Sequence, residues 1–89
     1  MIRRRIVISN KLGLHARAAA KFVQSASGFA SEIELAHDQQ RVNGKSIMGV
    51  MMLAASQGSS LDLIADGDDE VQAVAALEQL VNGKFGEGE

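Results

Sequence analysis

Apolar residues recur along this chain with two different periods, and the changes between them predict its secondary structure. Alternation of apolar and polar residues predicts strands, and apolar residues recurring at intervals of three and four predict helices. The predicted strands are residues 2–8, 31–36, a short strand ending near Val42, and 61–66. The predicted helices are residues 16–27, 47–53, and a third that starts within 67–70 and ends at Gly83.

The resulting order, β-α-β-β-α-β-α, predicts an α+β open-faced sandwich in which three helices cover one face of a four-stranded antiparallel sheet. A parallel sheet fits less well, because the second and third strands are too close in sequence for a crossover. Gly28 is expected to end the first helix in the left-handed conformation. The helix residues expected to face the sheet are Ala19, Phe22, Val23, Ala26, Ala73, Val74, Leu77, Leu80 and Val81. Residues 1–89 are expected to form a single domain.

Composition and charge exclude several classes of function. The 89 residues include no Cys and only three aromatic residues, all Phe, and the formal net charge is −2. The absence of Cys excludes disulfides and thiolate metal sites and suits the reducing cytoplasm. No segment has the roughly 20 apolar residues of a membrane span, so we expect no membrane insertion. Few basic and aromatic residues disfavour nucleic-acid binding, and Arg3-Arg4-Arg5 is interpreted as a solvated strand start.

One histidine lies where a loop passes into the first predicted helix, in the sequence Gly13-Leu14-His15-Ala16-Arg17. The first turn of a helix has about four backbone N–H groups without intrahelical partners, and the helix dipole adds partial positive charge there. A phosphoryl group on His15 would meet the N–H groups of Ala16 and Arg17 and the Arg17 guanidinium. The pattern predicts that His15 holds a phosphoryl group transiently.

A simpler interpretation of His15 stays open at this point. A lone histidine at a helix start is often only a surface residue or a cap, and short motifs arise by chance. The other histidine, His37, falls in a predicted turn and is interpreted as solvated. The choice between the two interpretations therefore depends on the rest of the chain.

The segment 46–53 is unusually apolar for so short a helix. Ser46 is a suitable N-cap, and six of the next seven residues are apolar. A seven-residue helix is about 10 Å long and buries only one stripe, for which Val50 and Leu53 are suited. The residues expected to be exposed are Ile47, Met48 and Met51. Exposed apolar side chains on a small domain usually mark a protein partner's surface, and burial of the helix on two sides is the alternative.

These two segments together resemble the HPr family, the histidine phosphocarriers of the bacterial phosphoenolpyruvate-dependent phosphotransferase system. The resemblance runs from about Ile2 to Phe85 and includes the predicted element order. The matching segments are Gly13-Leu14-His15-Ala16-Arg17, Lys21-Phe22-Val23, Gly44-Lys45-Ser46-Ile47-Met48 and Asp68-Asp69-Glu70. Two separated motifs at the family spacing make the resemblance specific.

The resemblance implies that His15 accepts a phosphoryl group through Nδ1 from phosphorylated enzyme I and passes it to a IIA domain. Ala16 and Arg17 would bind the phosphate, and an HPr kinase/phosphorylase would modify Ser46 in bacteria that possess one. The expected partner-binding residues are Ala20, Lys21, Ile47, Met48 and Met51. The chain would be a monomeric cytoplasmic carrier with a covalent phosphohistidine intermediate rather than a stand-alone enzyme, and it would need no cofactor or metal.

The chain departs from the family pattern at several positions. Ala18 stands where proline is common, and Gln24 and Ser27 stand where sugar-pathway members often have lysine. The expected basic rim of the site is therefore Arg17, Lys21 and Lys45. The segment Asn10-Lys11-Leu12-Gly13 is similar to the nitrogen-related branch, NPr, whereas Gly44-Lys45-Ser46 is similar to the regulated HPr type, so the branch stays open.

Two other classes of function remain possible alternatives. One is a regulatory protein-binding module of the nitrogen-related branch, controlled by its phosphorylation state rather than serving sugar uptake. Family relatives that act only as regulators lack the histidine, so His15 favours transfer. The other is a small metabolite-binding domain, which would require a concave apolar pocket.

Overall fold

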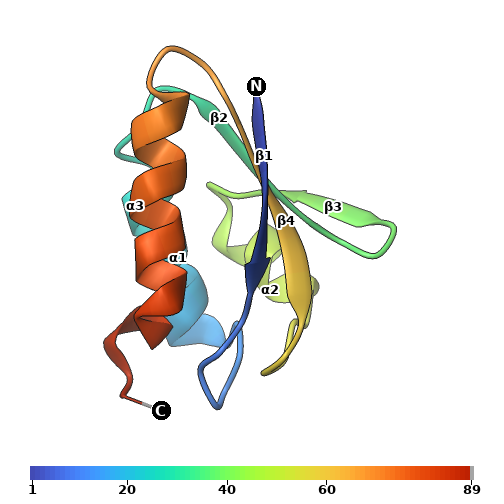
Figure 1. Cartoon of the computed structure of the whole chain (residues 1–89). Helices are drawn as coiled ribbons and strands as arrows, with labels where there is room; N and C mark the ends of the chain where they lie inside the picture. Colours follow the sequence, from blue (N-terminus) through green and yellow to red (C-terminus); the bar gives the residue numbers. More distant parts are fainter. Residues whose placement is uncertain (89) are drawn as a thin grey trace.

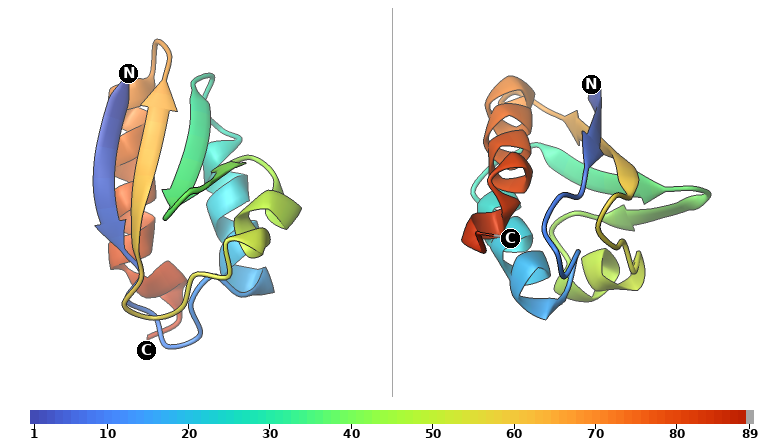
Figure 2. Two further views of the ribbon diagram at one scale, coloured as in Figure 1. Left: turned by 90° about the vertical axis from the view of Figure 1, so that its right-hand side faces the viewer. Right: turned by 60° about the horizontal axis from the view of Figure 1, so that its bottom comes forward.

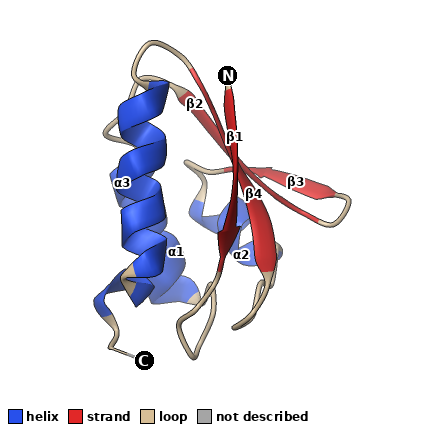
Figure 3. Cartoon of the chain, viewed as in Figure 1, coloured by secondary structure: helices blue, strands red, loops and turns tan. Residues whose placement is uncertain are grey.

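The helices and strands of the protein follow the predicted order. The computed structural model describes residues 1–88 and is drawn along the sequence in Figure 1 and by element type in Figure 3. The elements are β1 (Ile2–Val7), α1 (Ala16–Ala26), β2 (Glu32–His37), β3 (Gln40–Asn43), α2 (Ile47–Met52), β4 (Ser60–Asp66) and α3 (Glu70–Asn82). A short 3₁₀ turn, Lys84–Gly86, follows α3. Among residues 1–88, no helix is long and apolar enough to span a bilayer.

The strands of residues 1–88 form one antiparallel sheet in the spatial order β1-β4-β2-β3. Ala65 of β4 lies opposite Ile2 of β1 and Ile33 of β2, and Leu35 of β2 lies opposite Val42 of β3. The helices pack on one face of this sheet, and α3 and α1 lie side by side in both views of Figure 2. The predicted α+β open-faced sandwich is therefore confirmed.

The core lies between the sheet and the helices, and most of the helix residues in it belong to the predicted stripes. The buried residues of the helices, with Leu53 at the C-cap of α2, are Ala18, Ala19, Phe22, Ala26, Val50, Leu53, Ala73, Val74, Leu77 and Val81. Val23 and Leu80 were predicted to be buried but lie half-buried at the edge of the core. Phe85, in the 3₁₀ turn, is only 1% exposed. Full burial of one such side chain stabilises a fold by about 1.5–3 kcal/mol, so Phe85 anchors the segment after α3.

The arginines of β1 are exposed to solvent, as expected, and are also ion-paired. Arg3 and Arg5 donate to the Asp62 carboxylate on the neighbouring strand β4. The hydrogen bonds from Arg5 and then Arg3 hold the pKa of Asp62 below its usual value. Arg4 donates to Glu78 of α3 at 2.8 Å. The sequence did not indicate these pairs, because β1 and its acidic partners are far apart along the chain.

Two turns differ from the prediction. Gly28 does not have a positive φ, because α1 ends through Ser27 at φ −68° and the Gly28 N–H donates to the Ser25 carbonyl at 3.1 Å. That tighter last turn needs no left-handed residue. His37 lies at the end of β2, paired with Gln40, and not in the turn; its side chain is 25% exposed.

Candidate functional site

The loop between β1 and α1 is shaped by close contact with the chain after α2. Gly13 has a φ of +67°, and a Cβ at this position would lie 2.4 Å from the Ala55 carbonyl oxygen. The Leu14 N–H donates to the same oxygen at 2.9 Å. Position 13 therefore requires glycine for both backbone conformation and space, and the contact fixes where α1 begins.

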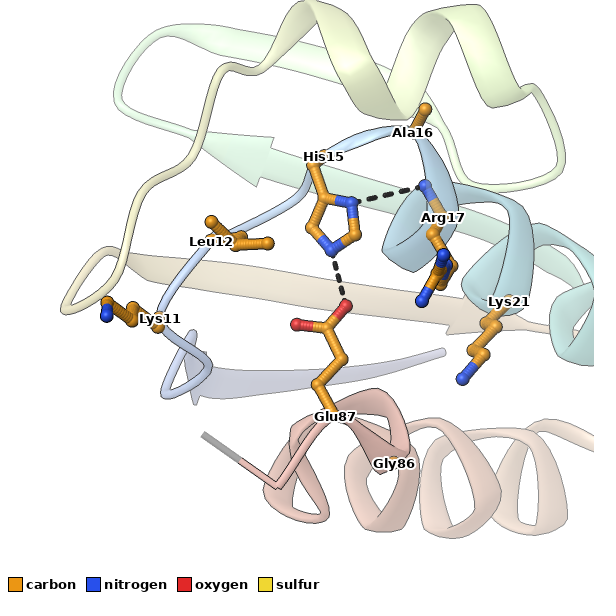
Figure 4. Close-up of a pocket in the computed structure, with 8 residues that line it drawn as sticks. All are labelled: Lys11, Leu12, His15, Ala16, Arg17, Lys21, Gly86 and Glu87. Carbon is orange, nitrogen blue, oxygen red and sulfur yellow. Dashed lines mark hydrogen bonds and ion pairs between the residues drawn. The ribbon is translucent and has the colours of Figure 1, made fainter.

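His15 is the N-cap of α1 and has a partner at each ring nitrogen. Nδ1 accepts the Arg17 N–H at 3.3 Å, and Nε2 contacts a carboxylate oxygen of Glu87, as Figure 4 shows. The His15 side chain is 27% exposed, so another protein can reach the ring. The predicted placement of His15 at a helix start is confirmed. The simpler interpretation as a cap is also correct, because Nδ1 accepts a first-turn N–H group.

His15 lies on an open surface depression of about 630 Å³. The residues lining it are Lys11, Leu12, His15, Ala16, Arg17, Lys21, Gly86 and Glu87. Most of these side chains are charged or titratable, which differs from the concave apolar pocket that a metabolite-binding domain requires. Within residues 1–88, no group of three or more His, Cys, Asp or Glu side chains could hold a metal ion.

Of the three basic residues expected to form the rim of the site, Arg17 and Lys21 border the depression and Lys45 does not. Ala16 and Arg17 are exposed in the first turn of α1, where the expected phosphate contacts would lie. Lys21 also borders the depression, but its Nζ donates to the Phe85 carbonyl at 2.7 Å. Lys45 is not part of this rim. Its Nζ donates at 2.7 Å to the carbonyl of Phe29, which follows the opposite end of α1 from His15.

Two residues for which the sequence predicted no role at this site, Asn10 and Glu87, complete the surroundings of His15. Asn10 is fully buried, and its Nδ2 donates to the Gly13 carbonyl at 2.8 Å and to Glu87 Oε1 at 2.9 Å. The hydrogen bond from Asn10, with a further one from His15, holds the pKa of Glu87 below its usual value. A glycine-rich segment such as 83–88 has no apolar periodicity, so no sequence signal indicated this carboxylate.

Ser46 caps α2 as predicted, because its Oγ accepts the Gly49 N–H at 3.0 Å. Val50 and Leu53 face the core with exposures of 0% and 4%. The opposite side of the helix is apolar and exposed: Ile47 44%, Met48 71%, Met51 39% and Met52 64%. The exposure agrees with the prediction, whereas a role of these residues in binding stays a prediction.

The start of α1 lies next to the end of α2, because Ala55, which follows α2, accepts the N–H of Leu14 just before His15. α1 packs against α2, and in Figure 4 the α2 ribbon passes beside Ala16. Ala20 is exposed one turn after Ala16 on α1. The exposed apolar side chains of α2 therefore belong to a helix that packs against α1.

The chain is similar to known proteins over nearly its whole length. The family described as "PTS HPr component phosphorylation site" matches residues 2–83. Phosphocarrier protein HPr of Neisseria meningitidis serogroup A is 57% identical over 89 residues, covering 100% of both chains. Phosphocarrier protein HPr of Cupriavidus necator is 52% identical over 89 residues with the same coverage. The crystal structure of HPr-C-His from Thermoanaerobacter tengcongensis has a TM-score of 0.94 and 54% identity, covering 98% of each chain.

Proposed function

The chain belongs to the HPr family and is a phosphocarrier of the phosphotransferase system; from this premise we propose that His15 carries the phosphoryl group. His15 accepts the group from phosphorylated enzyme I and passes it to a IIA domain. The observation that supports this assignment most directly is the position of Nδ1 at the start of α1, beside the Arg17 N–H. His37 has no such surroundings, since it lies in the β2–β3 hairpin.

In the transfer, the lone pair of His15 Nδ1 forms a bond to phosphorus. The bond between phosphorus and the donor group breaks, and its electron pair stays with the donor. The N–H groups of Ala16 and Arg17, with the exposed Arg17 guanidinium, offset the charge of the bound phosphoryl group. One guanidinium and a helix start bind phosphate only moderately, so the group can leave again for the next acceptor.

The partner surface that we propose joins the start of α1 to the exposed side of α2. Its members are Ala20, Lys21, Ile47, Met48 and Met51, beside Arg17. The apolar members offer area that a partner can desolvate, and methionine adapts to partners of different shape. The basic side chains suit acidic residues on enzyme I and on IIA domains.

Phosphorylation by enzyme I and phosphoenolpyruvate tests the assignment of His15. We expect one acid-labile, base-stable phosphoryl group per chain, lost in His15→Ala and retained in the control His37→Ala. Both variants should keep the wild-type circular-dichroism spectrum. Labelling that persists in His15→Ala would show that another residue accepts the group.

Ser46 is proposed as a regulatory phosphorylation site for an HPr kinase/phosphorylase. Its hydroxyl lies at the edge of the exposed apolar residues Ile47 and Met48. A phosphate there would add up to two negative charges to a surface that enzyme I must desolvate. Because the partner surface suits an acidic protein, repulsion would weaken docking further.

The variant Ser46→Asp tests this regulatory role. We expect His15 phosphorylation by enzyme I to slow by about tenfold at low salt, equivalent to about 1.4 kcal/mol, and by less at high salt. Ser60→Asp is the matched control, because it makes the same substitution at an exposed serine of β4 that lies beside Arg3 and Arg5, away from α1 and α2. Phosphorylation of Ser46→Asp at the rate of Ser60→Asp at low salt would reduce Ser46 to a helix cap.

The branch of the phosphotransferase system that this carrier serves is the remaining alternative. The segment 10–13 is similar to the nitrogen-related branch, but the local geometry accounts for two of its residues: Asn10 bonds Gly13, and Gly13 contacts Ala55. This similarity is therefore weak support for a purely regulatory module. Transfer from the phosphorylated chain to a sugar-specific IIA domain, compared with a nitrogen-related one, separates the two.

We further propose that the protein acts as a cytoplasmic monomer. The absence of Cys supports a reducing compartment. A monomer leaves the surface around His15 open to enzyme I and IIA domains in turn. Sedimentation equilibrium over a range of concentrations should give the monomer mass, and a concentration-dependent dimer that blocks phosphorylation would contradict this proposal.

A further inference from the structure

The segment after α3 is built into the surroundings of His15. Phe85 is buried in the core, and Lys21 Nζ donates to its carbonyl at 2.7 Å. Lys84 and Phe85 have φ values of +56° and +55°, a conformation that residues with side chains adopt only where surrounding contacts maintain it. These contacts place Glu87 beside the histidine, where its side chain is 13% exposed.

Asn10 connects Glu87 to the loop that presents His15. One Asn10 amide group donates both to the Gly13 carbonyl, two residues before His15, and to Glu87 Oε1. The other carboxylate oxygen, Oε2, contacts His15 Nε2. The histidine and the carboxylate are therefore held at a defined separation by a buried side chain that bonds to both segments.

The contacts of the two ring nitrogens specify one tautomer of His15. A carboxylate accepts hydrogen bonds, so Nε2 bears the proton shared with Glu87. Nδ1 accepts the Arg17 N–H and so presents its lone pair at the helix start. We propose that Glu87 is a positioning residue for phosphoryl transfer, which holds the His15 proton on Nε2 and leaves Nδ1 unprotonated, so that its lone pair can attack phosphorus once it releases the Arg17 N–H. This inference rests on the proposed function of His15.

Glu87 also matches the charge that the transfer creates. When Nδ1 binds phosphorus, the proton remains on Nε2, so the ring gains a positive charge that the carboxylate stabilises. Glu87 acts at the opposite ring nitrogen from the phosphoryl group. When the group leaves, the electron pair of the N–P bond returns to Nδ1 and the starting tautomer is restored. The Asp carboxylate of a Ser-His-Asp triad orients the imidazole of the triad histidine in the same way.

The test compares Glu87→Ala and Glu87→Gln in the full chain with the control Glu78→Gln. Glu78 is a suitable control because it too is an ion-paired carboxylate, but its partner is Arg4 of β1. Nitrogen NMR of the unphosphorylated protein reports the His15 tautomer, and transfer kinetics from phosphorylated enzyme I report kcat and KM. Circular dichroism confirms that each variant is folded.

In Glu87→Ala we expect both His15 tautomers to be populated and kcat to fall by about tenfold, similar to the loss when the outer hydrogen-bond partner of a metal-bound histidine is removed. KM should stay unchanged, because Glu87 is not part of the proposed partner surface. Glu87→Gln keeps an acceptor oxygen without the charge, so it should keep the tautomer and lose part of kcat. An unchanged tautomer in Glu87→Ala, or a fall in kcat no larger than in Glu78→Gln, would overturn the inference. Absence of labelling at His15 in the wild-type chain would instead overturn the proposed function, and with it any transfer role of Glu87.

Discussion

The start of α1 is capped by a histidine and the start of α2 by a serine, and the two caps differ in geometry and in support. His15 Nδ1 accepts the Arg17 N–H at 3.3 Å, whereas Ser46 Oγ accepts the Gly49 N–H at 3.0 Å. The His15 cap is longer than the usual N–H hydrogen bond of about 2.9–3.0 Å. Because Nδ1 must release the Arg17 N–H before it can bind phosphorus, a weak hydrogen bond at this position favours transfer.

The two helix starts are also held by different parts of the chain. The loop that holds His15 is fixed by Asn10 within the loop and by two remote segments, represented by Ala55 and Glu87, through hydrogen bonds. The start of α2 depends on local contacts of Ser46 and on the buried side chains of Val50 and Leu53. The part of the surface that carries His15 thus depends on tertiary contacts. The part proposed for docking (the docking end, Ile47, Met48 and Met51) depends on one short amphipathic helix.

Gly13→Ala should have the largest effect on stability, because the added Cβ would clash with the Ala55 backbone at the contact that positions His15. We expect it to destabilise the fold by more than about 3 kcal/mol, from the positive φ together with the clash against the Ala55 backbone. Gly58→Ala is the control: Gly58 has a φ of +91°, but its Cβ would meet nothing within 4 Å. Urea denaturation measures both losses. Equal losses would mean that the loop moves away from Ala55 without penalty.

Met48→Ala tests the docking end. Met48 is 71% exposed, so we expect little change in melting temperature but a loss of more than about 1 kcal/mol in binding to enzyme I. Val71→Ala is the control, because Val71 is an apolar residue of α3 that is 65% exposed. Calorimetric titration with enzyme I measures the binding. A lower melting temperature with unchanged binding would assign Met48 to the core.

Ser46→Ala tests whether the α2 cap is structural. We expect the free energy of unfolding to fall by about 0.5–2 kcal/mol, the usual effect of losing an N-cap, with phosphorylation of His15 unchanged. Ser27→Ala, an exposed serine at the end of α1, should leave stability unchanged. If the two variants unfold at the same urea concentration, the Gly49 N–H is satisfied without Ser46.

The smallest expected effect is a pH dependence confined to the His15 end. Hydrogen bonds from Asn10 and His15 lower the pKa of Glu87 in the folded protein from its ordinary 4.5. Its stabilising contribution is therefore present above about pH 4.5 and is lost as the pH falls through the lower folded pKa. Unfolding of the wild type and of Glu87→Gln between pH 6 and pH 3 should show a stability difference that shrinks on acidification. A difference that is constant with pH would mean that the charge of Glu87 does not contribute.

Much of the fold could be predicted from the sequence because its signals are local. Alternation along β4 and the apolar spacing of α1 indicate their elements from neighbouring residues alone. The placement of His15 at a helix start and of Ser46 as a cap depends on the few residues that follow each one. The exposed side of α2 followed from its length, since a short helix cannot bury six apolar side chains.

The partners of those residues were decided by the tertiary structure. The sequence placed Lys21 and Lys45 in the same basic rim, yet the two lysines donate to carbonyl groups near opposite ends of α1. Glu87 lies 72 residues from His15 along the chain, in a glycine-rich segment without periodicity. The packing of Phe85 into the core, together with the hydrogen bond from Asn10, brings the Glu87 carboxylate to the His15 ring. Local spacing thus determined which side chains are presented, while long-range packing determined the proton and charge environment in which His15 lies.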